Sequence, residues 1–327
     1  MSDRITIREA TLADAPVLSD LERRSPILTS GGWLTIDRGD DYFAAARLQE
    51  DVTVLIAERE GEPLGVFCGA LHDAVIADVP RRVLYIHHAR IPPEHQRQGL
   101  GHRMAAELAR RYEGRFDTQY WYISQANGPS QGFARRAPNR WPVTPLWLHC
   151  RAEAIAGPAF GRPCAPADAT DIAAMLNALH GREHMFVPAT PERLHRRLAR
   201  DPAQYGWPNL WRTERAVVGV WLQGERIVTR LRRFDGSVVE QRGAAVLDYG
   251  CLPGGEEELV LLLRSWAGEL ACRGFDSLGV FTWPGAPLEG LLRGLAERIE
   301  VFDFWTPQLP VPEDAAQRGV YVDPVYF

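Results

Sequence analysis

The pattern of apolar and polar positions is clearest in the first third of the chain. Residues 83–91 form an apolar run rich in Val, Ile and Tyr, and two prolines follow it. Such residues favour strands and prolines end them, so a strand is predicted here. After a glycine-rich stretch, Leu100, Met104 and Leu108 recur at i, i+4 and i+8, as one face of a helix does. Gly114 stands where that helix is expected to stop. The pattern predicts a strand, a tight turn and a helix.

The same pattern returns in the second half of the chain. The motif R-x-A-x-x-A-D-A at residues 8–15 reappears as R-x-C-x-x-A-D-A at 162–169, an offset of 154 residues (162 − 8). The same offset places G-V-F at 65–67 onto G-V-W at 219–221. Two matches in one register indicate a duplicated unit. The alternative is that the matches arise by chance, because helix starts often have similar sequences. We therefore predict two halves, residues 1–152 and 160–327.

The turn after the first predicted strand carries the most informative motif. Residues 96–101 read Q-x-x-G-x-G. A glycine turn at a helix start directs unpaired N–H groups and the positive end of the helix dipole at one point. Glycines also let a ligand approach the backbone closely, so the turn suits a pyrophosphate. The spacing matches neither the dinucleotide fingerprint nor the P-loop.

This motif resembles the (R/Q)-x-x-G-x-(G/A) acetyl-CoA signature of the GNAT superfamily of N-acetyltransferases. Residues 5–15 look like the family's opening strand and helix start, and 54–58 and 63–68 look like its second and third strands. N-G-P-S-Q-G-F at 127–133 resembles its late N-x-x-S/A-x-x-F helix. The resemblance implies an α/β fold: two tandem GNAT-like domains, each a mixed, mostly antiparallel twisted sheet flanked by helices. It also implies acetyl-CoA as co-substrate, with no metal.

The resemblance carries cofactor contacts onto this sequence position by position. Backbone pairing with the pantetheine arm is expected from Ala89, Arg90 and Ile91. The expected pyrophosphate cradle comprises Gln96, Arg97, Gln98, Gly99, Leu100, Gly101 and His102. Asn127, Ser130 and Phe133 are expected along the pantetheine and thiol end.

Amide formation needs a group that removes a proton from the amine and donors that polarise the thioester. In the family the base usually lies on the fourth strand, where this chain has His87 and His88. Neighbours on a strand face opposite ways, so only one is expected to reach the cleft. The candidates are His87, then His88, with water-mediated deprotonation as the alternative.

The family's usual general acid is missing. Many relatives carry a tyrosine after the phenylalanine of the late helix, and this chain has Ala134 after Phe133. Tyr122, Tyr120 or Ser130 could protonate the leaving thiolate instead, and a coenzyme A thiolate could also leave unaided.

The second half has lost the cofactor loop. Residues 244–249 are predicted to form the matching strand, but the following turn has no Q-x-x-G-x-G. Glu256, Glu257 and Glu258 stand in the first turn of the next predicted helix, where they suit the dipole and would repel a pyrophosphate. This half is predicted to be a degenerate copy that shapes the acceptor site. Its apolar closing segment, 319–327, is expected to be docked.

Composition narrows the choice of partners. The net charge of −5 argues against a nucleic-acid partner, and the chain has no apolar run of membrane-spanning length. Five scattered cysteines without C-x-x-C favour a reducing, cytoplasmic location. We expect a monomer or homodimer.

The sequence therefore predicts an acetyl-CoA-dependent N-acetyltransferase acting on a small-molecule amine. Residues 23–48 are expected to contribute to acceptor selection. The alternatives are a non-catalytic acyl-CoA-binding regulatory module and an aminoacyl-tRNA-dependent transferase.

Overall fold

A computed structural model describes residues 5–134 and 138–326 of the 327-residue chain. The strands are β1 (Ile5–Glu9), β2 (Ile27–Thr29), β3 (Gly32–Asp37), β4 (Val52–Arg59), β5 (Glu62–Ile76), β6 (Val79–Arg90), β7 (Thr118–Ser124), β8 (Leu146–Arg151), β9 (Arg162–Pro163), β10 (Leu210–Arg212), β11 (Ala216–Trp221), β12 (Val228–Arg232), β13 (Val238–Gln241), β14 (Gly243–Cys251), β15 (Ser277–Thr282) and β16 (Arg298–Trp305). The helices are α1 (Ala15–Arg23), α2 (Ala44–Arg47), α3 (Leu100–Arg111), α4 (Gly128–Ala134), α5 (Ala152–Ile155), α6 (Ala169–His180), α7 (Pro191–Leu198), α8 (Glu256–Cys272), α9 (Glu289–Arg293) and α10 (Ala315–Arg318).

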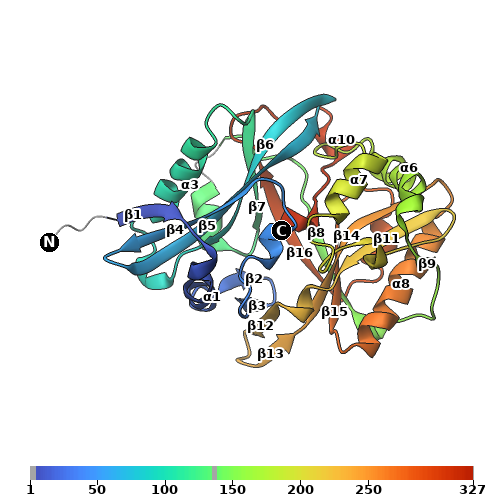
Figure 1. Ribbon diagram of the computed structural model, residues 1–327, viewed down its shortest axis with the longest axis horizontal. Coiled ribbons are helices and arrows are strands. Elements are labelled where there is room, and N and C mark those ends of the chain that lie inside the picture. The colour runs from blue at the N-terminus through green and yellow to red at the C-terminus, as the bar shows by residue number, and fades with distance from the viewer. Residues whose placement is uncertain (1–4, 135–137, 327) are drawn as a thin grey trace.

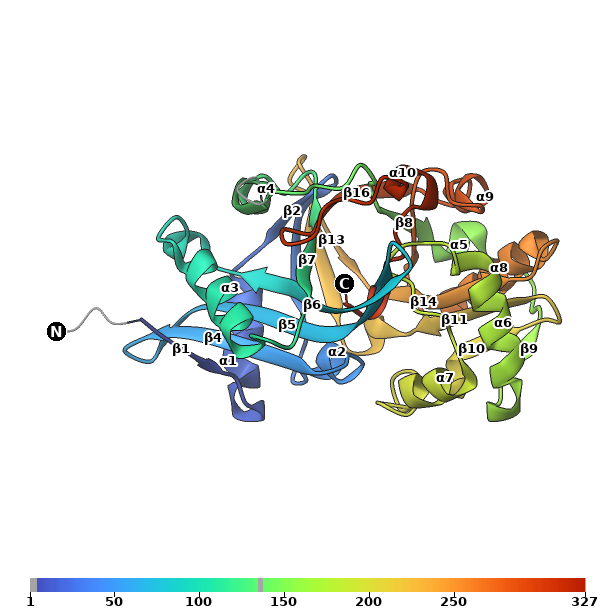
Figure 2. The ribbon, with the colours of Figure 1, turned by 90° about the horizontal axis from the view of Figure 1, so that it is seen from above.

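Both halves share one continuous sheet, and the predicted α/β tandem fold is confirmed. In the described part of the chain this sheet has the order β1-β4-β5-β6-β7-β16-β8-β15-β14-β11-β10-β9. Neighbours pair antiparallel except β6 with β7 and β14 with β15, which run parallel. Figure 1 shows the two halves side by side, and Figure 2 shows them from above with β7, β16 and β8 at the junction.

The halves exchange strands at that junction. The C-terminal strand β16 lies between β7 and β8, and its Phe304 pairs with Tyr122. Strand β8 in turn pairs with β15 of the second half. The division at 1–152 and 160–327 stays a prediction, and each half completes its sheet with a strand from the other side of that boundary.

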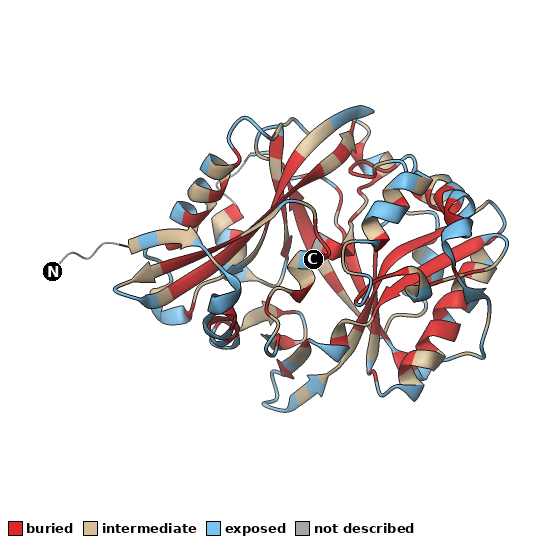
Figure 3. Ribbon diagram, in the orientation of Figure 1, coloured by how far each residue is buried: buried red, intermediate tan, exposed pale blue. Residues whose placement is uncertain are grey.

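Helices cover both faces of the N-terminal sheet. Helix α3 buries Leu100, Met104 and Leu108 against one face, together with Leu71 and Leu84. Helix α1 buries apolar residues on the opposite face. In the second half, α8 packs on β11, β14 and β15, and α6 packs on β11 and β14. Figure 3 shows the central strands of both halves as buried and the outer helix surfaces as exposed.

The repeated motif has the same geometry in both halves. Arg8 pairs with Asp14 at 2.7 Å, and Arg162 pairs with Asp168 at 2.6 Å, each bracing the turn that starts a helix. In each half the neighbouring strand adds a third charged side chain. Glu58 of β4 pairs with Arg8, and Arg212 of β10 pairs with Asp168. The arrangement confirms the duplication inferred from the 154-residue offset.

Two further features join the halves. A small sheet of order β13-β12-β3-β2 places β3 beside β12. The described part of the closing segment is docked as predicted, because Val320, Val322 and Val325 are buried in the largest core cluster, and Phe327 lies outside the described residues. The Val325 carbonyl accepts a 3.0 Å hydrogen bond from Nε2 of Gln49. None of the helices in residues 5–134 and 138–326 has the length and apolar character to cross a bilayer.

Candidate active site

Strands β6 and β7 separate in the N-terminal half. Their parallel pairing covers Val83–Thr118, Leu84–Gln119 and Tyr85–Tyr120 and then ends. Strand β6 continues to Arg90 beside β5, while β7 turns to pair with β16. The separation leaves an opening between two strands of one sheet, and the glycine motif follows β6 at the end of it.

The glycine motif forms the start of α3, as predicted. Gly99 is the N-cap residue with a φ of +75°, Arg97 has a φ of +62°, and no side chain caps the helix. The amide side chains of Gln96 and Gln98 brace the loop, donating to Ile91 O at 2.9 Å and Glu94 O at 3.2 Å. The first-turn N–H groups of α3 have no intrahelical acceptor. They are therefore available to an anion.

The space above the motif is open. Arg97, Gln98, Gly99 and His102 are exposed, and a Cβ added at Gly99 would meet no atom within 4 Å. At Gly101 an added Cβ would make ordinary contacts with Ile91 and Phe67, at 3.6 and 3.7 Å. Close approach to the backbone is therefore easiest at Gly99, where the positive φ also favours glycine.

Helix α4 meets the start of α3. The Phe133 ring lies 4.7 Å, centroid to centroid, from the His102 ring and 6.1 Å from Trp121. Oδ1 of Asn127 accepts the Ser130 N–H at 3.3 Å and so caps α4. The structure thus brings together His102, Asn127, Ser130 and Phe133, which the sequence had placed in two separate motifs.

The two candidate bases lie on the same side of the sheet, so the expected alternation of their side chains does not hold, and which of them reaches the cleft stays a prediction. The register of β5 against β6 shifts between Val66 and Cys68, and this shift marks a bulge in β6. His88 has a φ of +54°. The bulge cancels the alternation of neighbouring side chains. His87 pairs with Cys68, which packs under α1, and the two histidine rings are 6.3 Å apart.

His88 belongs to a buried charged network. Its Nε2 lies 2.8 Å from Oε1 of Glu22, and Nη2 of Arg38 lies 3.1 Å from its ring nitrogens. Arg38 also donates through Nε to Oε2 of Glu22 at 2.8 Å, and Arg90 lies 3.7 Å from that carboxylate. Burial lowers the pKa of His88 to about 4. Both ring nitrogens have polar neighbours, so His88 is poorly placed to receive a substrate proton.

The Glu22 carboxylate remains ionised in this network. Burial alone raises its pKa, but the charges of Arg38 and His88 bring the pKa well below its usual range. Glu22 and Arg38 are not predicted as site residues from the sequence, because no spacing links a helix residue to a residue of the acceptor segment. Two residues of segment 23–48, Arg38 and Tyr42, lie beside His88.

His87 has the opposite character. Its ring stacks on Tyr85 with centroids 4.7 Å apart and planes 4° apart, and burial lowers its pKa well below the usual value. Its Nε2 is buried and has no hydrogen-bond partner among the described residues. A neutral imidazole with a vacant nitrogen can accept a proton from a ligand that reaches it.

Tyr122 faces the same aromatic cluster. Its ring stacks on Phe304 at 4.9 Å and meets Tyr85 edge-on at 5.8 Å. Burial raises its pKa well above the usual value, so its hydroxyl stays protonated near neutrality and can donate a hydrogen bond.

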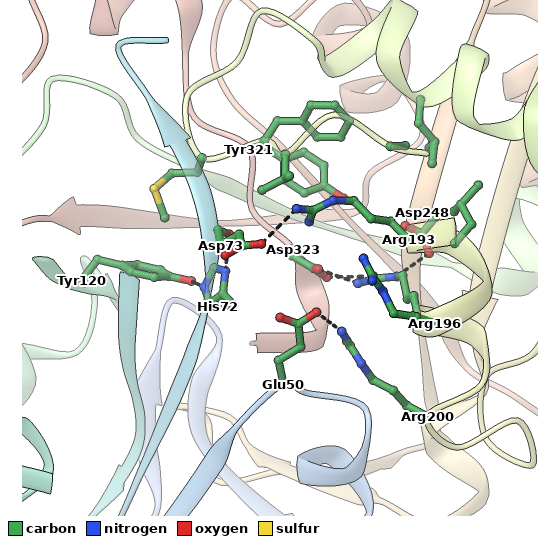
Figure 4. A pocket seen from close by; sticks show the side chains of 17 residues that line it. Glu50, His72, Asp73, Tyr120, Arg193, Arg196, Arg200, Asp248, Tyr321 and Asp323 are labelled. Carbon is green, nitrogen blue, oxygen red and sulfur yellow. Dashed lines mark hydrogen bonds and ion pairs between the residues drawn. The ribbon is translucent and has the colours of Figure 1, made fainter. Parts of the chain in front are cut away.

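A cavity of about 420 Å³ lies between the halves. Its walls include His72 of β5, Tyr120 of β7, Asp248 of β14 and the docked closing segment with Asp323 (Figure 4). Arg197 of α7 bridges these two carboxylates, donating to Asp248 at 3.0 Å and to Asp323 at 2.6 Å. Within the described ranges, no group of three or more His, Cys, Asp or Glu side chains is arranged to hold a metal ion.

The start of the matching helix in the second half carries a different charge. Strands β14 and β15 also separate after three pairs, ending at Ala245–Gly279. At α8, however, the carboxylate of Glu256 accepts the Gly254 N–H at 3.1 Å, and Glu257 and Glu258 stand in the same turn. Helix α8 has no side-chain cap either, but the three carboxylates of its first turn would repel a phosphate arriving there.

Comparisons with known proteins agree with this fold. The family model described as "Acetyltransferase (GNAT) family" matches residues 18–137. A Saccharomyces cerevisiae N-myristoyltransferase with bound myristoyl-CoA superposes with a TM-score of 0.65 at 8% identity, over 98% of this chain and 86% of that one. A GCN5-related N-acetyltransferase from Sphaerobacter thermophilus gives a TM-score of 0.57 at 16% identity, over 95% and 98%. At such identities the likeness shows the fold. No curated protein matches by sequence.

Proposed function

We propose that this chain is a tandem acyltransferase of the acetyltransferase (GNAT) family, whose model matches residues 18–137, and that its N-terminal half transfers an acetyl group from acetyl-CoA to an amine. The observation that carries the proposal is the open, uncapped start of α3 at Gly99, beside the separated strands β6 and β7. A pyrophosphate would bind the N–H groups of 99–101, and the pantetheine arm would run along 89–91 into the opening.

Aromatic rings at the opening support a short acyl group. Tyr85, Tyr120, Tyr122 and Phe304 pack against one another there, with Tyr85 and Tyr120 stacked at 4.7 Å. Packed rings leave little room for a long chain. We therefore favour acetyl-CoA over a long-chain acyl-CoA, although the N-myristoyltransferase of yeast shares the fold.

The acceptor is proposed to be a small-molecule amine that enters through the cavity between the halves. Clefts between domains are favoured ligand sites, and this cavity reaches Tyr120 at the last paired position of β6 and β7. The second half would then form one wall of the acceptor site without binding a cofactor of its own.

His87 is proposed as the base of the attack and Tyr122 as the donor to the thiolate. The vacant Nε2 of His87 supports this choice over His88, whose nitrogens are engaged. The amine lone pair forms the C–N bond, the C–S electron pair goes to sulfur, and the nitrogen proton goes to His87.

The test is release of free coenzyme A thiol from acetyl-CoA across a panel of small amines. The proposal expects amine-dependent thiol release that is lost in Gly99→Val. Binding of acetyl-CoA without turnover for any amine would favour the alternative, a non-catalytic acyl-CoA-binding module.

A further inference from the structure

Tyr120 and His72 form a hydrogen-bonded pair on the wall of the cavity between the halves. Oη of Tyr120 lies 2.7 Å from Nε2 of His72, and Figure 4 shows both side chains at the edge of the cavity. Resting on the proposed acetyl transfer, we propose that this pair is a proton relay that converts a protonated primary amine entering from the cavity into the neutral nucleophile. It is separate from His87, which lies on the other side of Tyr85 in the ring stack.

The hydrogen bonds of His72 fix the direction of the relay. Its Nδ1 lies 2.8 Å from the carbonyl oxygen of Asp73, which can only accept, so Nδ1 carries a proton. In the neutral ring Nε2 is then the acceptor, and the Tyr120 hydroxyl donates to it. The Tyr120 oxygen keeps lone pairs that can accept a proton from a substrate N–H.

The position of Tyr120 connects the cavity to the opening. Tyr120 and Tyr85 are the last paired residues before β6 and β7 separate, and their rings stack at 4.7 Å. His72 is buried on β5, and its ring lies 5.6 Å from the Tyr120 ring. An amine bound in the cavity against Tyr120 would therefore stand at the base of the opening that is proposed to hold the thioester.

The chemistry requires two proton acceptors. A primary ammonium group loses two protons when it becomes an amide nitrogen, and the thiolate regains only one. In the relay the ammonium gives its first proton to the Tyr120 oxygen while the Tyr120 proton passes to Nε2 of His72. That proton leaves through the cavity to solvent. The second goes to His87 as the C–N bond forms, Tyr122 protonates the sulfur, and the proton held by His87 restores Tyr122, which gives amide, free thiol and one released proton.

The surroundings of His72 keep its ring neutral at rest. Burial is the largest effect and lowers its pKa, and Arg82 acts in the same direction. The Asp73 carbonyl, Asp323 and Glu50 act the other way. Arg193 faces the same part of the cavity and pairs with the Asp73 carboxylate at 2.9 Å. A neutral His72 can accept the transferred proton at pH 7.

The test compares two amines that differ in charge at pH 7. Propylamine is protonated and needs the relay, whereas methoxyamine is already neutral and does not. Tyr120→Phe and His72→Gln are assayed by thiol release at saturating acetyl-CoA. We expect each variant to lower kcat/KM for propylamine by roughly 10²-fold and to change it by less than about threefold for methoxyamine. The double variant should fall no further than the single ones, because the pair acts as one unit.

Tyr112→Phe is the matched control. It also removes a buried tyrosine hydroxyl, which donates to Asp51 O at 2.8 Å, but it lies away from the cavity. This variant should treat the two amines alike. Equal losses for both amines in Tyr120→Phe, or multiplicative losses in the double variant, would overturn the relay.

A second measurement does not depend on turnover. The ¹⁵N resonances of His72 in the whole protein should report a neutral ring protonated on Nδ1 between pH 6 and 8. A ring protonated on Nε2, or an imidazolium at pH 7, would overturn the relay. The wild-type protein could release no thiol with either amine while His72 still has the expected tautomer. The proposed acetyl transfer would then be wrong, whereas the direction assigned to the Tyr120–His72 hydrogen bond would stand.

Discussion

The contrast between His87 and His88 shows what a one-residue irregularity does to a site. A regular strand would have placed one ring on each face, and the bulge places both toward α1. His88 is then engaged by Glu22 and Arg38, while Nε2 of His87 is left without a partner among the described residues. The sequence indicated both histidines as candidates. The alternation of side chains along a strand could not reveal the bulge, because the bulge depends on the register of β5 against β6.

Replacing His87 with glutamine should lower kcat by about 10²-fold and leave the Kd for acetyl-CoA unchanged. The side chain is proposed to take a proton from the amine and not to contact the pyrophosphate. Steady-state kinetics and calorimetry on the same preparation check both parts.

His149→Gln is the control for that substitution. His149 is also largely buried, with a pKa lowered to about 3 by burial, but it lies on β8 in the second half's sheet. It should keep full kcat. An unchanged pH–rate profile in His87→Gln would reject the assignment and favour a water-mediated route.

At the scale of elements, the unit β6–turn–α3 was predictable and the exchange of β8 and β16 was not. Prolines, glycines and the i, i+4, i+8 spacing mark the unit within about thirty residues of sequence. The sequence of β16 does not indicate that its neighbour is β7 rather than β15. The alternation of apolar and polar residues along a strand specifies which face is buried but not which strand it pairs with.

Gly99→Val should abolish acetyl-CoA binding. Gly99 has a φ of +75°, so a β-branched residue is strained there, and its side chain would enter the open space that a pyrophosphate needs. Calorimetry against acetyl-CoA measures the effect.

Gly114→Val is a closely matched control. Gly114 has a φ of +74°, also has no atom within 4 Å of an added Cβ, and follows the other end of α3. The two variants should lose similar stability, but Gly114→Val should bind acetyl-CoA as the wild type does. Loss of binding in both would mean that strain in α3, and not access to Gly99, is responsible.

At the scale of the whole molecule, the exchanged strands make the halves interdependent. An isolated fragment 1–152 would lack β16, so the edge of β7 would be unpaired and Tyr122 would lose its stacking partner Phe304. We expect the fragment to aggregate or to melt well below the full chain, as measured by scattering and thermal unfolding. A monomeric fragment that acetylates the same amine at full rate would contradict the proposed role of the second half.

Buried histidines should make the protein less stable in weak acid. Burial lowers the pKa of His88 to about 4 and of His149 to about 3, while the unfolded chain titrates near 6.5. Below pH 6.5 the unfolded state therefore binds protons that the folded state does not, and stability falls as pH falls toward 4. The loss is up to about 1.4 kcal/mol per pH unit for each histidine. Urea denaturation at pH 7, 6 and 5 tests this, and equal midpoints at all three would contradict it.

A crystal structure with bound acetyl-CoA is the most direct test of the proposed site. We predict one coenzyme per chain, with its pyrophosphate on the N–H groups of 99–101 and its thioester between β6 and β7, facing His87 and the cavity side of Tyr120. A coenzyme bound at the start of α8, or a thioester outside the β6–β7 opening, would contradict it.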